Sequence, residues 1–276
     1  MSDVEVLIQE PFKVGESPVW DAEHGRLLFC DALAGTIHAI DPKTRARRVW
    51  EFGAHVGSFG LAQRGRWVVA IGCAVHLFDP ATGKSELLVQ CEPERPEWRL
   101  NDGKVGPDGA FWVGTMGPRG MEPVGTLYRV TTDGRAEKKI EGLRITNGLA
   151  WSPDGRTMYH AETRTRAIDA WDFDATTGAI ANPRRFPSIP DEDGAPDGAA
   201  TDSAGDYWAA GLWGSRINRF APDGRLVGHL PVPVTMPTMP CFGGDDMRTL
   251  FITSLSQYAS DEVKRDYPLT GSLLMT

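Results

Sequence analysis

Cysteine, basic charge and long apolar runs are all scarce in this sequence, and each shortage argues against a class of protein. The four cysteines, Cys30, Cys73, Cys91 and Cys241, form no C-x-x-C pair, so neither a zinc knuckle nor a dithiol redox motif is indicated. Two disulfides are the alternative, but we expect reduced, buried thiols, as in a cytosolic protein. The 29 lysines and arginines are outnumbered by 37 aspartates and glutamates, and the net charge of −8 argues against a nucleic-acid partner.

No stretch approaches the roughly 18 consecutive apolar residues of a membrane span. The N-terminal residues also lack the basic and apolar regions of a signal peptide. We therefore expect a cytoplasmic protein with no membrane partner. The sequence has no G-x-S-x-G, which disfavours a serine hydrolase. Its six histidines are scattered without metal-ligand or triad spacing, so we expect each to be structural or on the surface.

Glycine and proline, in contrast, are plentiful, with 31 and 20 residues. Seven Asp-Gly dipeptides punctuate the chain, and this dipeptide between apolar runs is a hairpin-turn signal. Around these turns one pattern recurs with a period of about 46 residues. A polar residue opens a short strand, a turn glycine follows, and then come an aromatic-bearing strand and a third strand. The clearest copies begin at Asn101, Asn147 and Asp197.

Six such copies of four short strands predict an all-β, six-bladed β-propeller, with residues 1–276 as a single domain. The last copy runs out of chain after its third strand, at residues 272–275. Residues 4–8 can supply the missing outer strand, so pairing of the N-terminal and C-terminal strands would close the ring and protect an edge. The irregular stretches 92–99, 117–125, 189–196 and 255–270 are expected to be loops over one face.

Four polar residues share one position in the repeat and should converge at the propeller axis: Glu16, Asn101, Asn147 and Asp197. Any one of them alone is better explained as a turn residue, but Glu is not a turn residue. Two carboxylates about 4 Å apart repel by roughly 4 kcal/mol at an effective dielectric near 20. Either one binds a proton or a central cation removes the repulsion, and oxygen ligands suit Ca²⁺, Mg²⁺ or Mn²⁺. Asp102, half of an Asp-Gly dipeptide, is expected in a turn.

Six short motifs, in order along nearly the whole chain, resemble those of the regucalcin (senescence marker protein)/gluconolactonase family. They are Gly-Glu-Ser-Pro-Val-Trp at 15–20, Arg-Leu-Asn-Asp-Gly at 99–103, Phe-Trp-Val-Gly-Thr-Met at 111–116, Thr-Asn-Gly-Leu at 146–149, Pro-Asp-Gly at 196–198 and Cys-Phe-Gly-Gly at 241–244. The resemblance implies a six-bladed propeller that holds one divalent metal ion. Ca²⁺ is favoured, with Zn²⁺, Mn²⁺, Mg²⁺ and Fe²⁺ as alternatives.

The resemblance also implies roles for individual residues. Glu16, Asn147 and Asp197 match the family's metal ligands, while Arg99 and Asn101 match the residues that bind substrate hydroxyls. Some members carry an acidic residue a few positions after Gly-Thr-Met that contacts the sugar. Here the stretch 117–123 is short and departs from that pattern, and Glu122 is the residue available for this role.

The implied activity is hydrolysis of a sugar lactone to the aldonic acid, with the metal polarising the carbonyl and activating water. Asp197 is the candidate general base. Two other functions stay open: a metal-dependent organophosphate or other ester hydrolase, and a non-catalytic calcium-binding regulatory propeller. The expected partner is a small-molecule sugar lactone, and the expected state is a monomer or weak homo-oligomer.

Overall fold

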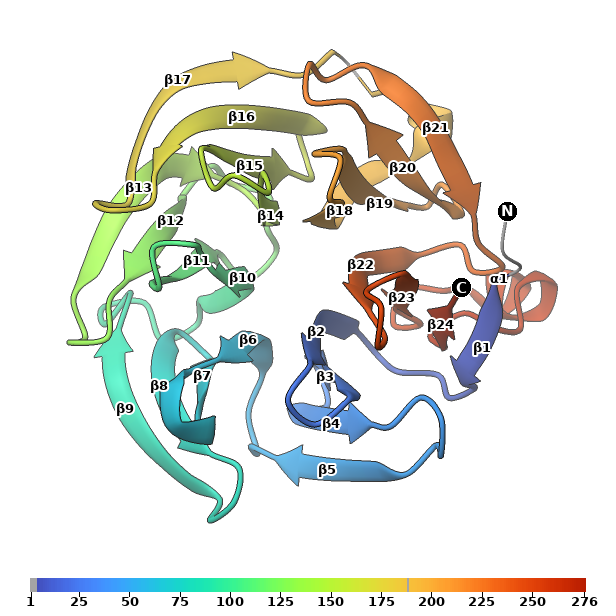
Figure 1. Ribbon diagram of the computed structural model, residues 1–276, viewed down its shortest axis with the longest axis horizontal. Helices are drawn as coiled ribbons and strands as arrows, with labels where there is room; N and C mark the ends of the chain where they lie inside the picture. The colour runs from blue at the N-terminus through green and yellow to red at the C-terminus, as the bar shows by residue number, and fades with distance from the viewer. Residues whose placement is uncertain (1–3, 188) are drawn as a thin grey trace.

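The computed structural model describes residues 4–187 and 189–276, which form six four-stranded sheets arranged as blades around an axis (Figure 1). Each sheet is an antiparallel meander, with one edge strand at the axis and the other at the rim. The all-β, six-bladed propeller predicted from the repeat is therefore confirmed. No helix in these described residues is long and apolar enough to cross a membrane.

The strands follow the chain from blade to blade. Blade 1 contains β2 (Gly15–Asp21), β3 (Arg26–Asp31), β4 (Thr36–Ile40) and β5 (Arg47–Glu51), and blade 2 contains β6 (Val56–Leu61), β7 (Trp67–Ile71), β8 (Ala74–Asp79) and β9 (Lys84–Gln90). Blade 3 contains β10 (Arg99–Val105), β11 (Phe111–Met116), β12 (Gly125–Val130) and β13 (Ala136–Leu143), and blade 4 contains β14 (Thr146–Trp151), β15 (Thr157–Glu162), β16 (Ala167–Asp174) and β17 (Ala179–Arg185). Blade 5 contains β18 (Ala195–Thr201), β19 (Tyr207–Leu212), β20 (Arg216–Phe220) and β21 (Leu226–Pro231). Blade 6 joins β22 (Pro237–Gly243), β23 (Thr249–Ser254) and β24 (Leu273–Met275) to β1 (Glu5–Ile8). The connections include the 3₁₀ turns η1 (Gln63–Gly65) and η2 (Asp191–Asp193) and the helix α1 (Asp261–Asp266).

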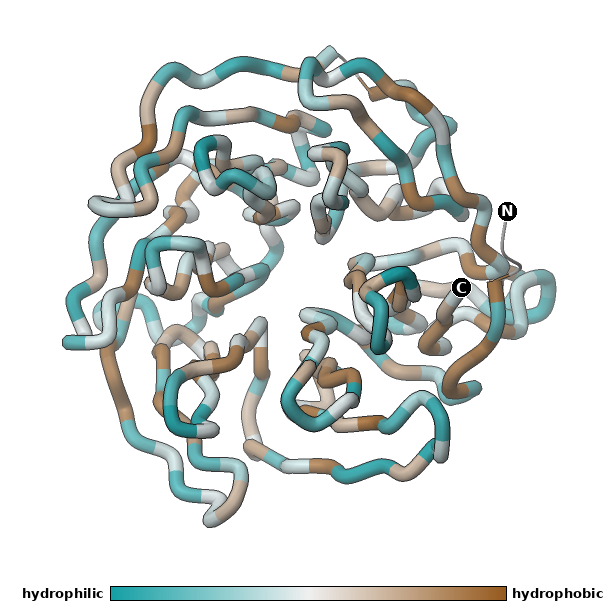
Figure 2. The backbone as a smooth tube through the Cα atoms, viewed as in Figure 1, coloured by the Kyte–Doolittle hydropathy of each residue, from teal (hydrophilic) through white to brown (hydrophobic). Residues whose placement is uncertain are grey.

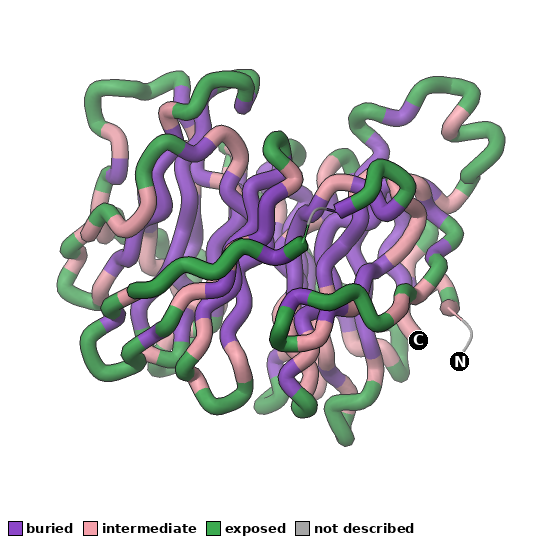
Figure 3. Tube along the Cα trace, turned by 90° about the horizontal axis from the view of Figure 1, so that it is seen from above, coloured by how far each residue is buried: buried purple, intermediate pink, exposed green. Residues whose placement is uncertain are grey.

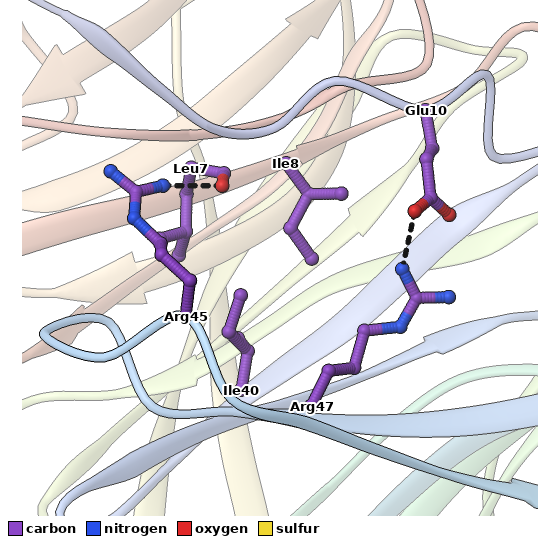
Figure 4. Close-up of a pocket in the computed structure, with 6 residues that line it drawn as sticks. All are labelled: Leu7, Ile8, Glu10, Ile40, Arg45 and Arg47. Atoms are coloured by element: carbon purple, nitrogen blue, oxygen red, sulfur yellow. Dashed lines mark hydrogen bonds and ion pairs between the residues drawn. The ribbon is translucent and has the colours of Figure 1, made fainter.

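The ring closes where the two ends of the chain pair. Val6 of β1 lies opposite Leu274 of β24, as predicted from the incomplete sixth repeat. Arg45, in the β4–β5 turn, donates to the carbonyl oxygens of Val6 and Leu7, and Arg47 donates to Glu10 over 2.7 Å (Figure 4). A cavity of about 390 Å³ at the rim contains none of the predicted site residues. It is lined by Leu7, Ile8, Glu10, Ile40, Arg45 and Arg47 (Figure 4).

Hydrophobic clusters between neighbouring blades form the core. Trp50 and Trp67 meet edge to face 4.8 Å apart between blades 1 and 2, and Trp112 and Trp151 meet 6.1 Å apart between blades 3 and 4. Trp112 and Trp151 are buried, as expected for core residues. Figure 3 shows buried segments running through the disc and exposed loops at its faces, and Figure 2 shows hydrophilic residues recurring along the rim and turns.

The inner strands all run in the same direction, so they all begin at one face of the disc. Antiparallel pairing puts the turn between the second and third strands of each blade at that same face. The loops 91–98, 117–124 and 255–272, and the described residues 186–187 and 189–194 of a fourth loop, therefore gather over one face, as predicted. All four cysteines are free thiols; three are buried, and Cys241 is only half-buried.

Candidate functional site

All six inner strands carry a β-bulge or irregularity near their beginnings, and four of these segments hold the predicted site residues. The pairing register shifts between Glu16 and Val19, Leu100 and Gly103, Asn147 and Ala150, and Pro196 and Ala199. A bulge bends the strand and re-aims a side chain, and bulges are frequent next to active sites. Glu16, Asn101, Asn147 and Asp197 all lie at or inside these bulges, near the beginnings of four strands that surround the axis (Figure 1).

A chain of hydrogen bonds fixes the two amide side chains. Arg99 Nη1 donates to Asn101 Oδ1 over 2.6 Å, and Asn101 Nδ2 donates to Asn147 Oδ1 over 3.1 Å. Asn147 Nδ2 in turn donates to Thr163 Oγ1 over 2.7 Å, and Thr163 Oγ1 donates to the Pro196 carbonyl oxygen over 2.8 Å. Because its nitrogen is held by Thr163, Asn147 has only its carbonyl oxygen left to act as a ligand. Sequence reasoning missed Thr163, whose role depends on contacts between blades.

Three carboxylates gather at the same place. Burial raises the pKa of Glu16 well above its usual range, and the charges of Asp197 and Asp102 raise it further. Burial and the charge of Asp102 likewise raise the pKa of Asp197. The three buried carboxylates thus lie within electrostatic range of one another, and a bound cation would relieve their repulsion.

Asp102 corrects the expectation from the sequence. It lies within β10 rather than in a turn, is 2% exposed, and its Oδ2 accepts a hydrogen bond from the Leu149 backbone N–H over 3.2 Å. Its Oδ1 is buried and has no hydrogen-bond partner among the described residues. Gly103 lies outside the left-handed region; a Cβ there would lie 2.6 Å from Ser58 Oγ. The glycine is therefore required by close packing between blades, not by a turn.

The donor set fits a hard cation. The predicted ligands are two carboxylates, Glu16 and Asp197, and one amide oxygen, from Asn147, which are ligand types that Ca²⁺ and Mg²⁺ accept. Within the described ranges no three His, Cys, Asp or Glu side chains form a metal-binding group. The predicted ligand set has only two carboxylates and takes its third oxygen from an asparagine.

Arg99, which lies within electrostatic range of Glu16 and Asp197, has His55 as a neighbour. The backbone joins them, because Leu100 N–H donates to Gly72 O over 2.7 Å and Gly72 N–H donates to His55 O over 2.9 Å. Burial and the charge of Arg99 lower the pKa of His55 to about 3, which keeps its imidazole neutral. No carboxylate of the described residues lies within 4.0 Å of the Arg99 guanidinium, so its remaining donors are available to a ligand.

The Glu122 carboxylate makes no hydrogen bond or ion pair with the described residues of the axial site. Glu122 is exposed on the loop 117–124, and within the described part of the chain its carboxylate makes no hydrogen bond or ion pair. The loop does lie over the same face as the site, so contact between Glu122 and a substrate stays a prediction.

The fold and the family match together place the chain among six-bladed propellers of the lactonase class. The chain belongs to the SMP-30/gluconolactonase/LRE-like family, whose sequence model matches residues 14–256. A 6-deoxy-6-sulfogluconolactonase from Pseudomonas putida is 36% identical over 98% of this chain and 93% of that protein. Regucalcin from Xenopus laevis is 31% identical over 98% of this chain and 92% of that protein.

Two solved structures have the same architecture. The calcium-binding protein regucalcin from Agrobacterium tumefaciens superposes with a TM-score of 0.93 and 27% identity, covering 98% of this chain and 92% of that one. A gluconolactonase from Xanthomonas campestris superposes with a TM-score of 0.79 and 26% identity, covering 99% of this chain and 88% of that one. The family resemblance inferred from the motifs is therefore confirmed.

Proposed function

We propose that this protein is a divalent-metal-dependent hydrolase that opens a sugar lactone to the aldonic acid. The observation that supports the proposal is a chain of hydrogen bonds through Arg99, Asn101 and Asn147, beside buried Glu16 and Asp197 carboxylates whose charges affect one another. Membership of the family, and likeness to relatives named as gluconolactonases, support lactone hydrolysis as the reaction.

Glu16, Asn147 and Asp197 are the residues that would hold the cation. When bound, a divalent ion would supply a Lewis acid for the carbonyl oxygen and lower the pKa of a coordinated water. Ca²⁺ is favoured because all three ligands are hard oxygen donors. A solved relative is also described as calcium-binding. Zn²⁺, Mn²⁺, Mg²⁺ and Fe²⁺ are the alternatives that metal add-back would compare.

Asp197 is the proposed general base. It accepts a proton from the attacking water, whose oxygen bonds to the lactone carbonyl carbon; the ring C–O bond then breaks and the leaving oxygen takes up a proton. Burial and Asp102 raise the pKa of Asp197, which makes it a better proton acceptor than an exposed aspartate. Coordination of the same carboxylate acts in the opposite direction, so the base strength depends on the balance of the two.

Arg99 and Asn101 are proposed to orient the sugar. The guanidinium offers a planar set of donors, and only its Nη1 is hydrogen-bonded to the described residues. Ring hydroxyls can accept from the free donors, and so can an anionic substituent. A gluconolactone with a sulfonate on carbon 6 is therefore one candidate substrate, beside the neutral aldonolactones. Glu122 is proposed to contact a sugar hydroxyl from its loop.

Ring-opening measured by pH-stat tests the proposal directly. The substrates are D-glucono-, D-xylono-, D-galactono- and L-arabino-lactones and 6-deoxy-6-sulfo-D-gluconolactone, before and after EDTA treatment and metal add-back. We expect hydrolysis that EDTA abolishes and one divalent ion restores. Glu16→Gln and Asp197→Asn should lower kcat/KM by roughly 10³-fold or more, whereas Glu86→Gln, at an exposed site on β9, should leave it unchanged.

The other outcomes point to the alternatives. Metal-dependent hydrolysis of aryl phosphotriesters or simple esters, without lactone turnover, would indicate that the protein is an ester hydrolase. Calcium binding without hydrolysis of any substrate would indicate a regulatory propeller.

A further inference from the structure

Two side chains of the inner strand β10 form hydrogen bonds with the inner strands of two other blades. Asp102 lies inside the bulge of β10, and Lys104 follows it two residues later in the same strand. Asp102 Oδ2 accepts from the Leu149 N–H on β14, and Lys104 Nζ donates to the Ala199 carbonyl oxygen on β18 over 2.6 Å. Blade 4 lies between blades 3 and 5 in the ring (Figure 1), so the lysine side chain joins two blades that are not neighbours.

The acceptor of Lys104 belongs to the strand that carries Asp197. Inner strands are the axial edges of their sheets, so some of their backbone N–H and C=O groups face the axis without a ladder partner. Ala199 is fully buried, and a buried carbonyl without a donor is costly. The register shift of β18 lies between Pro196 and Ala199, so Ala199 and Asp197 belong to the same bulged segment.

The positive charge of Lys104 favours the ionised forms of neighbouring side chains. Burial raises the pKa of Asp102, and the nearby Lys104 ammonium lowers it, which favours the ionised carboxylate. Lys104 acts in the same direction on the pKa of Cys241, on β22. The ammonium therefore lies among groups from blades 3, 5 and 6.

We propose that Lys104 is a positioning residue for the axial site, spanning from β10 to β18 and fixing the bulge that presents Asp197. The inference rests on the proposed function for the assignment of Asp197 as a metal ligand. Lys104 touches neither metal nor substrate in this role; it acts through the Ala199 carbonyl.

The test compares Lys104→Met, which keeps the length of the side chain but removes the donor and the charge, with Lys104→Arg. Calcium and manganese affinities of EDTA-stripped proteins are measured by isothermal titration calorimetry, together with kcat, KM and Tm. We expect Lys104→Met to weaken metal binding about 10- to 100-fold, as when a group that orients a ligand is lost. Its kcat should fall while KM changes little, and Lys104→Arg should recover part of both losses.

Arg129→Met is the matched control. Arg129 lies in the same blade and forms a buried ion pair with Asp108, with Nε 2.6 Å from Oδ2, but it does not belong to an inner strand. Its loss should lower Tm and leave metal affinity and kcat unchanged. If Lys104→Met lowers Tm in the same way yet binds metal as tightly as the wild type, Lys104 is merely structural and the proposal is wrong.

The two proposals fail in different ways. A wild-type protein that binds metal but hydrolyses no lactone contradicts the proposed function, while the affinities of the Lys104 variants still decide the role of Lys104. A wild-type protein that binds no divalent cation overturns both. If Lys104→Met does not fold, Lys104→Gln, whose shorter and uncharged side chain weakens the bond to the Ala199 carbonyl, is compared with Lys104→Arg, and wild-type metal affinity in the Gln variant overturns the positioning role.

Discussion

Ser17 adopts a φ of 46°, a left-handed conformation that is uncommon for a residue with a side chain, directly beside Glu16. Its N–H donates to Glu16 Oε2 over 3.0 Å, so the unusual turn of the backbone contributes to holding the carboxylate in place. Residues kept in sparsely populated conformations cluster at functional sites, where the surroundings offset the strain. The site therefore contains an unfavourable backbone conformation at Ser17 as well as carboxylates that repel one another.

That repulsion gives a prediction for the metal-free protein. Because burial and two neighbouring carboxylates raise the pKa of Glu16, its ionised form destabilises the fold at neutral pH. Glu16→Gln should therefore raise the free energy of unfolding in EDTA, by on the order of 1 kcal/mol for each unit of pKa elevation removed. Urea denaturation at pH 7 measures it, with exposed Glu86→Gln as the control.

Addition of calcium should reverse the order. The wild type gains stability in proportion to the logarithm of free metal over Kd, and Glu16→Gln gains little. A variant that is less stable than the wild type in EDTA would show that the carboxylates do not repel one another in the cation-free fold.

Some residues of the axial site could be predicted from the sequence and others could not, for physical reasons. Glu16, Asn147 and Asp197 share a place in the repeat, and that place becomes the axis once the strands form blades. The Asp-Gly dipeptide at 102–103 is a turn signal, so the sequence predicts a turn there. In the structure, Gly103 instead allows close packing between blades 2 and 3. Thr163 and Lys104 act on backbone groups of other blades, which no local pattern reveals.

At the scale of single strands, the two kinds of glycine should respond differently to substitution. Gly109, between β10 and β11, has a φ of 75° and open space around its Cβ position, so it is a turn glycine. Gly103, within β10, would place a Cβ 2.6 Å from Ser58 Oγ and 2.9 Å from the Trp112 carbonyl oxygen. Close approach to backbone cannot be relieved by a change of rotamer.

We therefore expect Gly103→Asn to lower the free energy of unfolding by about 2–3 kcal/mol or more, as overpacking does. Gly109→Asn should cost less than about 1 kcal/mol, because asparagine tolerates the left-handed conformation. Chemical denaturation of both variants compares them. Equal losses would mean that Gly103 is not held by packing.

For the whole molecule, closure of the ring joins residues from opposite ends of the chain. The missing strand of the sixth repeat was visible in the sequence, so the pairing of β1 with β24 was predictable. The contacts of Arg45 with the Val6 and Leu7 carbonyls were not, since the β4–β5 turn approaches β1 only after the ring has closed. The seam thus combines a strand pairing encoded in the repeat with side-chain contacts that exist only in the complete fold.

Stability of the whole ring should also depend on pH through a buried histidine. Burial lowers the pKa of His160, on β15, to about 4, and its Nε2 has no hydrogen-bond partner among the described residues. In the unfolded chain its pKa is about 6.5. Above that pH both states are neutral; between about 6.5 and about 4 only the unfolded state takes up the proton, so stability falls as the pH falls.

His160 should therefore remove up to about 1.4 kcal/mol of unfolding free energy per pH unit in that window. The raised pKa values of Glu16 and Asp197 act in the opposite direction, because the folded state then takes up protons more readily than the unfolded one. The contribution of His160 is isolated by comparing slopes: urea denaturation from pH 7 to pH 5 in EDTA should give a shallower loss, or a larger gain, for His160→Gln than for the wild type. His229→Gln, at an exposed position on β21, should keep the wild-type slope. Equal slopes for His160→Gln and the wild type would mean that His160 accepts its proton as readily in the folded ring as in the unfolded chain.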